Sequence, residues 1–330
     1  MGNWKKSFEK SAQASAKKKA TAFTEKLKAE TVGCRLRTSK FGARKALTRT
    51  QVKQAAAAFS AKGEFLTASK KLLDTANPAY REVTAVIAQA KAYWRAMTFP
   101  YPEKGIRLLK RDRVDKFAAD MQAMVATLEL KVKTLSDQYD DIREAAREKL
   151  GDLFNEGDYP ALIDAEFDLG WEFPNLAAPE FLKTMNPVLY EAEKAKLEAQ
   201  FNEAVKLTEL ALADELNTLV SSLLDKLTPG EDGKPKTFQK TTVENLNEFF
   251  TRFTEMDLGS SDELRELVEQ AQQAVNGVDA NSIRKDQALR DALSGKLKAV
   301  GEQLEKSLVT KPKRAIVFED EPAAAEGGDQ

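Results

Sequence analysis

The sequence contains no histidine and a single cysteine, Cys34, among 330 residues. The absence of histidine excludes His-containing zinc sites, HExxH proteases and nucleophiles activated by histidine. One cysteine excludes an internal disulfide and cysteine-rich metal sites, and it agrees with a reducing compartment. Walker A and GxGxxG phosphate loops are also absent. We therefore predict no catalytic residue, no cofactor and no metal site; a carboxylate- or lysine-based enzyme stays open, but no pair of residues stands out.

The sequence also lacks a long apolar run. No stretch approaches the roughly 18 consecutive apolar residues that a membrane-spanning helix requires, and the N-terminus has no apolar signal core. With 42% hydrophobic residues, the chain is nevertheless able to form a sizeable core. We therefore expect a cytoplasmic protein with no membrane span.

Charge of both signs is abundant but unevenly distributed. The formal net charge is −1, yet residues 1–53 contain fifteen Lys or Arg against three Glu. Such a segment attracts phosphate backbones or an acidic partner, although a solubilising tail, or one that folds against the acidic remainder, is an equally good interpretation. The candidate nucleic-acid contacts, here and in a second basic run, are Lys5, Lys6, Lys17, Lys18, Lys19, Arg35, Arg37, Lys40, Arg44, Lys45, Arg107, Lys110, Arg111 and Arg113.

Helical patterns dominate from residue 48 onward. Asn77-Pro78 and Asn186-Pro187 each join a capping residue to a proline suited to the first helical turn, so we expect helices to begin there. Apolar residues at spacings of three and four predict two long helices, near residues 112–150 and 187–227.

These patterns predict an all-α fold. We expect the two long helices to form an antiparallel, coiled-coil-like hairpin, with additional shorter helices packed on it. Alternation at Val32, Cys34 and Leu36 allows one small two-stranded β ribbon, with residues 315–318 as its second strand. The apolar stripes of the long helices leave open whether they are covered within one chain or in a homo-oligomer.

Shifts in composition predict four segments along the chain. They are a basic, partly flexible segment at 1–47, a main helical domain at 48–228, a C-terminal helical subdomain at 229–310, and an acidic flexible tail at 311–330.

One stretch, KAYWRAMTFPYPEKGIRLLKRDRVDKF at residues 91–117, combines aromatic, proline and basic residues. Aromatic rings among cations are typical of a surface on which bases stack. A structural turn is the interpretation that we favour, because Tyr93 and Trp94 continue the apolar stripe of the preceding helix and the prolines reverse the chain.

Several motifs occur in an order that resembles a known family. They are RLRTSKFGARKALT, MTFPYPEKGIRLLKRDRVDKF, Tyr139 near the end of the following helix, and DLGWEFP. Over about residues 30–230 the chain resembles a family of uncharacterised, mostly helical proteins of bacteria, plasmids and phages. Genes of that family often neighbour those of MoxR-type AAA+ ATPases and von Willebrand A-domain proteins. The resemblance therefore implies an adaptor or substrate of such a machine, and it implies no site residues.

The function that we expect is a non-enzymatic scaffold or adaptor that acts through protein–protein contacts. The partner that the resemblance implies is a MoxR-type AAA+ ATPase. The alternative is nucleic-acid binding through the basic N-terminal segment.

Overall fold

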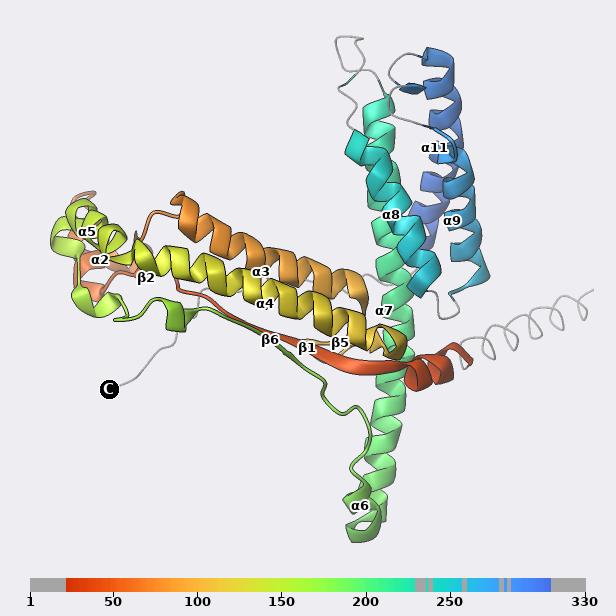
Figure 1. Cartoon of the computed structure of the whole chain (residues 1–330), viewed down its shortest axis with the longest axis horizontal. Coiled ribbons are helices and arrows are strands. Elements are labelled where there is room, and N and C mark those ends of the chain that lie inside the picture. Colours follow the sequence, from red (N-terminus) through yellow and green to blue (C-terminus); the bar gives the residue numbers. More distant parts are fainter. Residues whose placement is uncertain are drawn as a thin grey trace, which may run out of the picture. The chain divides into compact units, whose positions relative to one another are not determined.

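The structure is a computed structural model that describes residues 22–228, 236, 240–256, 260–278, 282–283 and 286–309. These residues form two compact units, each assembled from separate stretches of chain. Unit 1 takes residues 22–33, 99–111 and the described residues from 175 to 309, and unit 2 takes residues 34–98 and 112–174. The fold is mostly helical, with a small antiparallel sheet (Figure 1).

Unit 2 is organised around α3 (Pro78–Met97) and α4 (Val114–Asp137), which lie side by side (Figure 1). The start of α3 is confirmed: the Asn77 side chain accepts a hydrogen bond from the Tyr80 amide at 3.1 Å, and Pro78 follows in the first turn. Val83 of α3 and Phe117 of α4 are fully buried. Each such side chain stabilises the fold by about 1.5–3 kcal/mol.

The single long helix predicted near 112–150 is wrong, because the chain forms α4 and then α5 (Tyr139–Leu150). The break is at Gln138, whose amide bonds back to the carbonyls of Leu135 and Ser136 and so tightens the last turn of α4. The Tyr139 hydroxyl then donates to the Pro160 carbonyl at 3.0 Å. The apolar period continues across the break, so periodicity alone could not reveal it.

The all-α prediction is confirmed only in part, because the fold is mostly helical but also contains a four-stranded sheet. Its strand order is β4 (Thr98–Pro100), β5 (Ile106–Lys110), β1 (Thr31–Ser39) and β6 (Asp168–Glu172). Within unit 2, β1 pairs antiparallel with β6, and Leu36 lies opposite Trp171. The predicted ribbon partner at 315–318 lies outside the described residues. Strands β4, β5 and β6 have only three to five residues each and lie among turn-forming residues, so an alternation of apolar and polar residues cannot be recognised in them.

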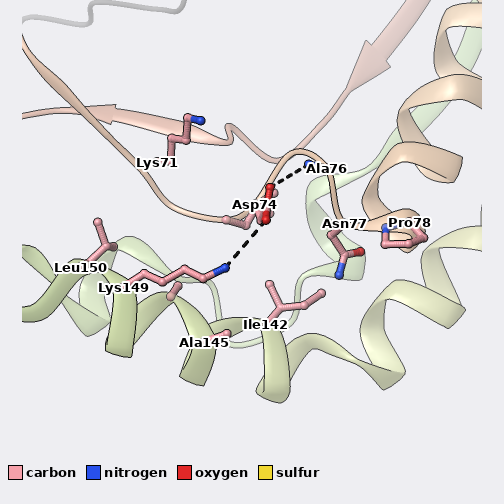
Figure 2. A pocket seen from close by; sticks show the side chains of 11 residues that line it. Lys71, Asp74, Ala76, Asn77, Pro78, Ile142, Ala145, Lys149 and Leu150 are labelled. Carbon is pink, nitrogen blue, oxygen red and sulfur yellow. Dashed lines mark hydrogen bonds and ion pairs between the residues drawn. The ribbon is translucent and has the colours of Figure 1, made fainter.

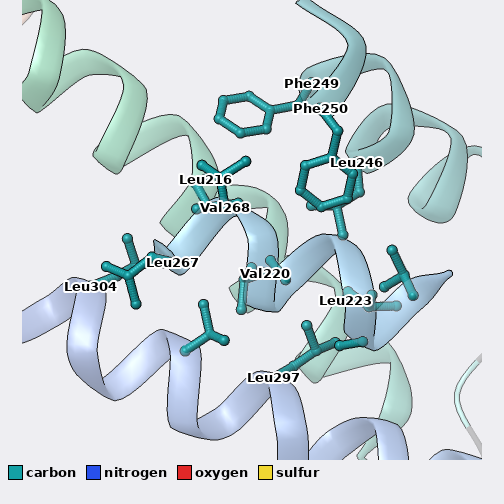
Figure 3. Close-up of a cluster of buried hydrophobic side chains, with 14 of the residues drawn as sticks. Leu216, Val220, Leu223, Leu246, Phe249, Phe250, Leu267, Val268, Leu297 and Leu304 are labelled. Atoms are coloured by element: carbon teal, nitrogen blue, oxygen red, sulfur yellow. The ribbon is translucent and has the colours of Figure 1, made fainter. Parts of the chain in front are cut away.

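In unit 1, the long helix predicted at 187–227 is confirmed as α7 (Pro187–Leu227), and its cap is the Asn186 side chain, which accepts from the Leu189 amide at 3.1 Å. The C-terminal half of α7 packs against α8 (Lys240–Met256), α9 (Asp262–Val275) and α11 (Gln287–Val309). Figure 3 shows this core, in which Leu216, Leu246 and Leu297 are fully buried.

The antiparallel pairing of the two long helices is not confirmed. Within unit 2 the main partner of α4 is α3, and within unit 1 the main partner of α7 is α11. The predicted segments 48–228 and 229–310 also differ from the two units, because α7 packs on helices that follow it in the sequence. An apolar stripe predicts that one face of a helix is buried, but it does not predict which other helix covers that face.

The remaining elements are short. They are β2 (Arg44–Ala46), α2 (Arg49–Ala57), η1 (Gly63–Phe65), β3 (Ser69–Lys71), η2 (Arg111–Arg113), η3 (Gly151–Leu153), η4 (Glu156–Asp158), η5 (Asp164–Glu166) and α6 (Glu180–Met185), together with a helix at residues 22–30. Among the helices described here, none has the length and apolar composition needed to cross a bilayer.

Candidate nucleic-acid interface

The structure distributes the predicted nucleic-acid contacts over several places. Lys5, Lys6, Lys17, Lys18 and Lys19 lie outside the described residues. Arg35 and Arg37 lie on β1, where the Arg35 guanidinium is 2.8 Å from the Glu172 carboxylate on the neighbouring strand. Arg107, Lys110 and Arg111 belong to unit 1, and Arg113 belongs to unit 2. Lys40, Arg44 and Lys45 also belong to unit 2, and the last two lie on β2.

The aromatic residues of segment 91–117 are engaged within the protein. Phe99 and Tyr101 are buried in unit 1, where the Tyr101 ring meets Phe201 with 5.6 Å between centroids. In unit 2 the Tyr93 ring stacks on Phe117, and its hydroxyl donates to Asp120 at 2.5 Å. Rings that pack in this way are not available to bases, which supports the interpretation of this segment as a structural turn.

A compact basic feature is formed instead by residues 44–71, which we name the basic finger. Its base is the ribbon of β2 and β3, in which Lys45 lies opposite Lys70. The chain between the two strands forms α2 and η1, which pack on each other. The finger contains seven Lys or Arg and one acidic residue, Glu64. The finger therefore carries a net positive charge.

Two cations of the finger, Lys45 and Lys70, form ion pairs with Asp158 that hold the finger against the rest of unit 2. The Asp158 carboxylate lies 2.5 Å from the Lys70 ammonium and 2.7 Å from the Lys45 ammonium. Lys70 also donates to the Leu153 carbonyl at 2.6 Å, and its side chain is only 6% exposed. Burial raises the pKa of Asp158, but the two ammonium groups outweigh burial and hold that pKa below its ordinary value.

The other five cations of the finger are exposed, and the structure gives none of them an ion pair with a described residue. They are Arg44, Arg49, Lys53, Lys62 and Lys71. Arg44 lies directly opposite Lys71 on the ribbon, an arrangement of like charges that destabilises an isolated strand pair. A bound anion would remove this repulsion. Arg44 and Lys71 therefore add like charge to the ribbon, and neither has an ion pair with a described residue.

The tip of the finger carries two exposed phenylalanines. Helix α2 starts with a capping box, in which Thr48 and Gln51 each bond the backbone of the other. It ends at Ala57, and Ser60 in the turn that follows adopts a left-handed φ of 54°. The Ser60 amide donates to Ala57 and the Ala61 amide donates to Ala56, a pattern that closes a helix end.

Phe59 and Phe65 flank this turn and are 82% and 86% exposed. After the turn the chain passes close to α2: a Cβ added to Gly63 would lie 3.0 Å from Cγ of Lys53. Both rings therefore lie on a turn whose backbone is fixed by hydrogen bonds and by packing on α2, and neither ring contributes to a core.

A pocket of about 570 Å³ adjoins the ribbon in unit 2 (Figure 2). Its floor is apolar and includes Ile142 and Ala146 of α5. At its rim the Lys149 ammonium lies 3.8 Å from Asp74, whose carboxylate also accepts from the Ala76 amide at 2.9 Å. The exposed Lys71 also lines the pocket, so its charged lining contains two cations and one carboxylate.

Sequence reasoning found Arg44 and Lys45 but missed most of the finger. The basic N-terminal region of residues 1–53 ends inside the feature, and residues 48–71 fall within the predicted main helical domain. A signal was available, because residues 44–71 combine seven basic residues with two aromatic ones and a single acid. The exposure of the two phenylalanines, in contrast, depends on the tertiary fold.

Comparison with protein-family models, with curated proteins and with solved structures found no match. The resemblance to the phage and plasmid family therefore stays a prediction. In the part of the chain that is described, no three His, Cys, Asp or Glu side chains gather in a way that would hold a metal ion.

Proposed function

We propose that this protein is a non-enzymatic nucleic-acid-binding protein whose basic finger contacts the phosphate backbone. The observation that carries the proposal is the set of five exposed cations along the finger that have no ion pair with a described residue. Cations that have no carboxylate partner contribute their full charge to a polyanion, because no ion pair within the protein has to be broken first.

Salt dependence measures this contact. On a single strand, five phosphate contacts give a slope of log K against log salt of about −3.5, and on a duplex about −4.5. Fluorescence anisotropy with labelled oligonucleotides across a salt series supplies the slope. A variant with Arg49→Gln, Lys53→Gln and Lys62→Gln should bind more weakly, with a slope on a single strand that is smaller in magnitude by about 2.

The matched control removes the same number of charges from another exposed place. Lys183→Gln, Lys194→Gln and Lys196→Gln do so on α6 and α7 of unit 1. A variant lacking residues 1–21 removes the five predicted lysines that precede the described residues. If the control and the finger variant weaken binding equally, or if the truncation alone abolishes binding, the finger is not the binding site.

A second proposed function is the scaffold or adaptor role, and a separate surface favours it. At α6 and the start of α7, the side chains of Phe181, Met185, Val188 and Leu189 are exposed. No residue of α7 before Phe201 is buried within the described structure. Exposed apolar groups that gather in this way are typical of a protein–protein contact.

The partner proposed for this surface is the MoxR-type AAA+ ATPase that the resemblance implies. A variant with Phe181→Ser and Met185→Ser should lose binding to a purified ATPase of this type, whereas Leu130→Ser, at an exposed position of α4, should not. Equal binding by the two variants would contradict the adaptor proposal. The cytoplasmic location also stays a prediction.

A further inference from the structure

Phe59 and Phe65 distinguish the basic finger from a surface that binds phosphate alone. A phosphate site gains nothing from an exposed phenyl ring, and each ring leaves a large apolar area in water. Both rings lie within the basic finger, with Lys62 between them in the sequence and Lys53 six residues before Phe59. Aromatic rings between cations are the arrangement with which proteins bind unpaired bases, because every base has a face on which a ring can stack.

We infer that the finger binds single-stranded nucleic acid, with Phe59 and Phe65 stacking on unpaired bases while the five free cations contact the flanking phosphates. This inference rests on the proposed function and names the ligand class of the same site. It predicts a preference for single strands over duplexes, with little preference among base sequences, because every base can stack on a ring.

The local backbone supports this role. The left-handed Ser60 follows Phe59 directly in the turn after α2, and the Phe65 amide donates to the Lys62 carbonyl at 3.0 Å. The two rings therefore project from a turn that is already formed, so binding does not have to order it. In a duplex the base faces are covered by their neighbours, and a ring can reach them only if base pairs unstack first.

The test compares strands that differ only in their bases. The probes are a labelled thymidine strand of about 20 nucleotides, an abasic strand of the same length and backbone, and a duplex. The wild-type protein should bind the thymidine strand at least tenfold more tightly than the abasic strand, since each stacked base contributes roughly 5- to 150-fold. Phe59→Leu with Phe65→Leu should remove this difference and leave affinity for the abasic strand unchanged.

Leucine keeps an apolar side chain at each position, and both positions are exposed, so the variant should fold. Phe59→Tyr with Phe65→Tyr keeps the rings and should bind as the wild type does. Equal affinity of the wild type for thymidine and abasic strands overturns the inference and leaves the phosphate contact standing. Tighter binding to the duplex than to the thymidine strand also overturns it. Absence of binding to all three probes at low salt would instead refute the proposed function itself.

Discussion

Removal of the Asp158 carboxylate should unfold the base of the finger, and its cost follows from the burial of its partners. In Asp158→Ala, the Lys70 ammonium stays only 6% exposed and keeps a single acceptor, the Leu153 carbonyl. Breaking a buried pair on one side in this way costs about 3–5 kcal/mol. Lys45 is 55% exposed, so Lys45→Met should cost at most about 1 kcal/mol.

The double variant Asp158→Ala with Lys70→Met tests the reasoning. It removes both buried charges together, so it should be more stable than Asp158→Ala alone. Urea unfolding followed by tryptophan fluorescence is a suitable assay, because Trp94 and Trp171 both lie in unit 2 and Trp4→Phe removes the third tryptophan. With a slope of about 2 kcal/mol per molar urea, Asp158→Ala should lower the midpoint by about 1.5–2.5 M.

The pH dependence gives an independent check of the same pair. The pKa of Asp158 is lower in the folded protein than in the unfolded chain, so its contribution is present above the unfolded pKa of about 3.9. That contribution is lost as the pH falls through the folded pKa. A double variant as unstable as Asp158→Ala, or a wild type and Asp158→Ala with parallel stability curves below pH 4, would refute the explanation.

Two further predictions concern unit 2 and the tyrosines. Gly151 has a φ of 49°, so Gly151→Ala should cost about 1–3 kcal/mol in a thermal melt, whereas Gly170→Ala, at a position with ordinary φ and open space, should be nearly neutral. Burial raises the pKa of Tyr101 and that of Tyr139 to about 12, so the stability that these neutral hydroxyls contribute is present below pH 10 and lost as the pH rises towards 12. Absorbance at 295 nm and circular dichroism should therefore change together in this range; a tyrosinate signal that is complete before the helical signal falls would contradict the assignment.

The sequence predicted what local chemistry determines. Asn77-Pro78 and Asn186-Pro187 marked helix starts correctly, because a cap and a first-turn proline act over three or four residues. The spacing of apolar residues likewise predicted the length of α7, because each helical turn contributes its own residue to the apolar face. It failed at Gln138, where the hydrogen bonds of the last turn change while the apolar period does not.

Features that depend on tertiary partners were not predictable in this way. In unit 2 the main partner of α4 is α3. The apolar stripe of α4 predicts that this face is covered, but it does not identify the helix that covers it. The same limit applies to the candidate site: the positive charge of Arg44 can be read from one sequence, but the pairing of Lys70 with Asp158 and the exposure of Phe59 cannot.

The assembly of unit 1 from distant stretches has a consequence for its synthesis. The Thr24 hydroxyl donates to Asn202 at 2.7 Å across a separation of 178 residues, and Leu27 shares a core with Phe201. At the usual rate of translation, the residues near Thr24 emerge roughly 10–35 s before their partners. During that interval Phe23 and Leu27 can meet only the part of their core that residues 99–108 supply, and a chain that stops before residue 201 never completes it. The segment around Phe23 and Leu27 therefore leaves the ribosome well before the helix that completes its core has been made.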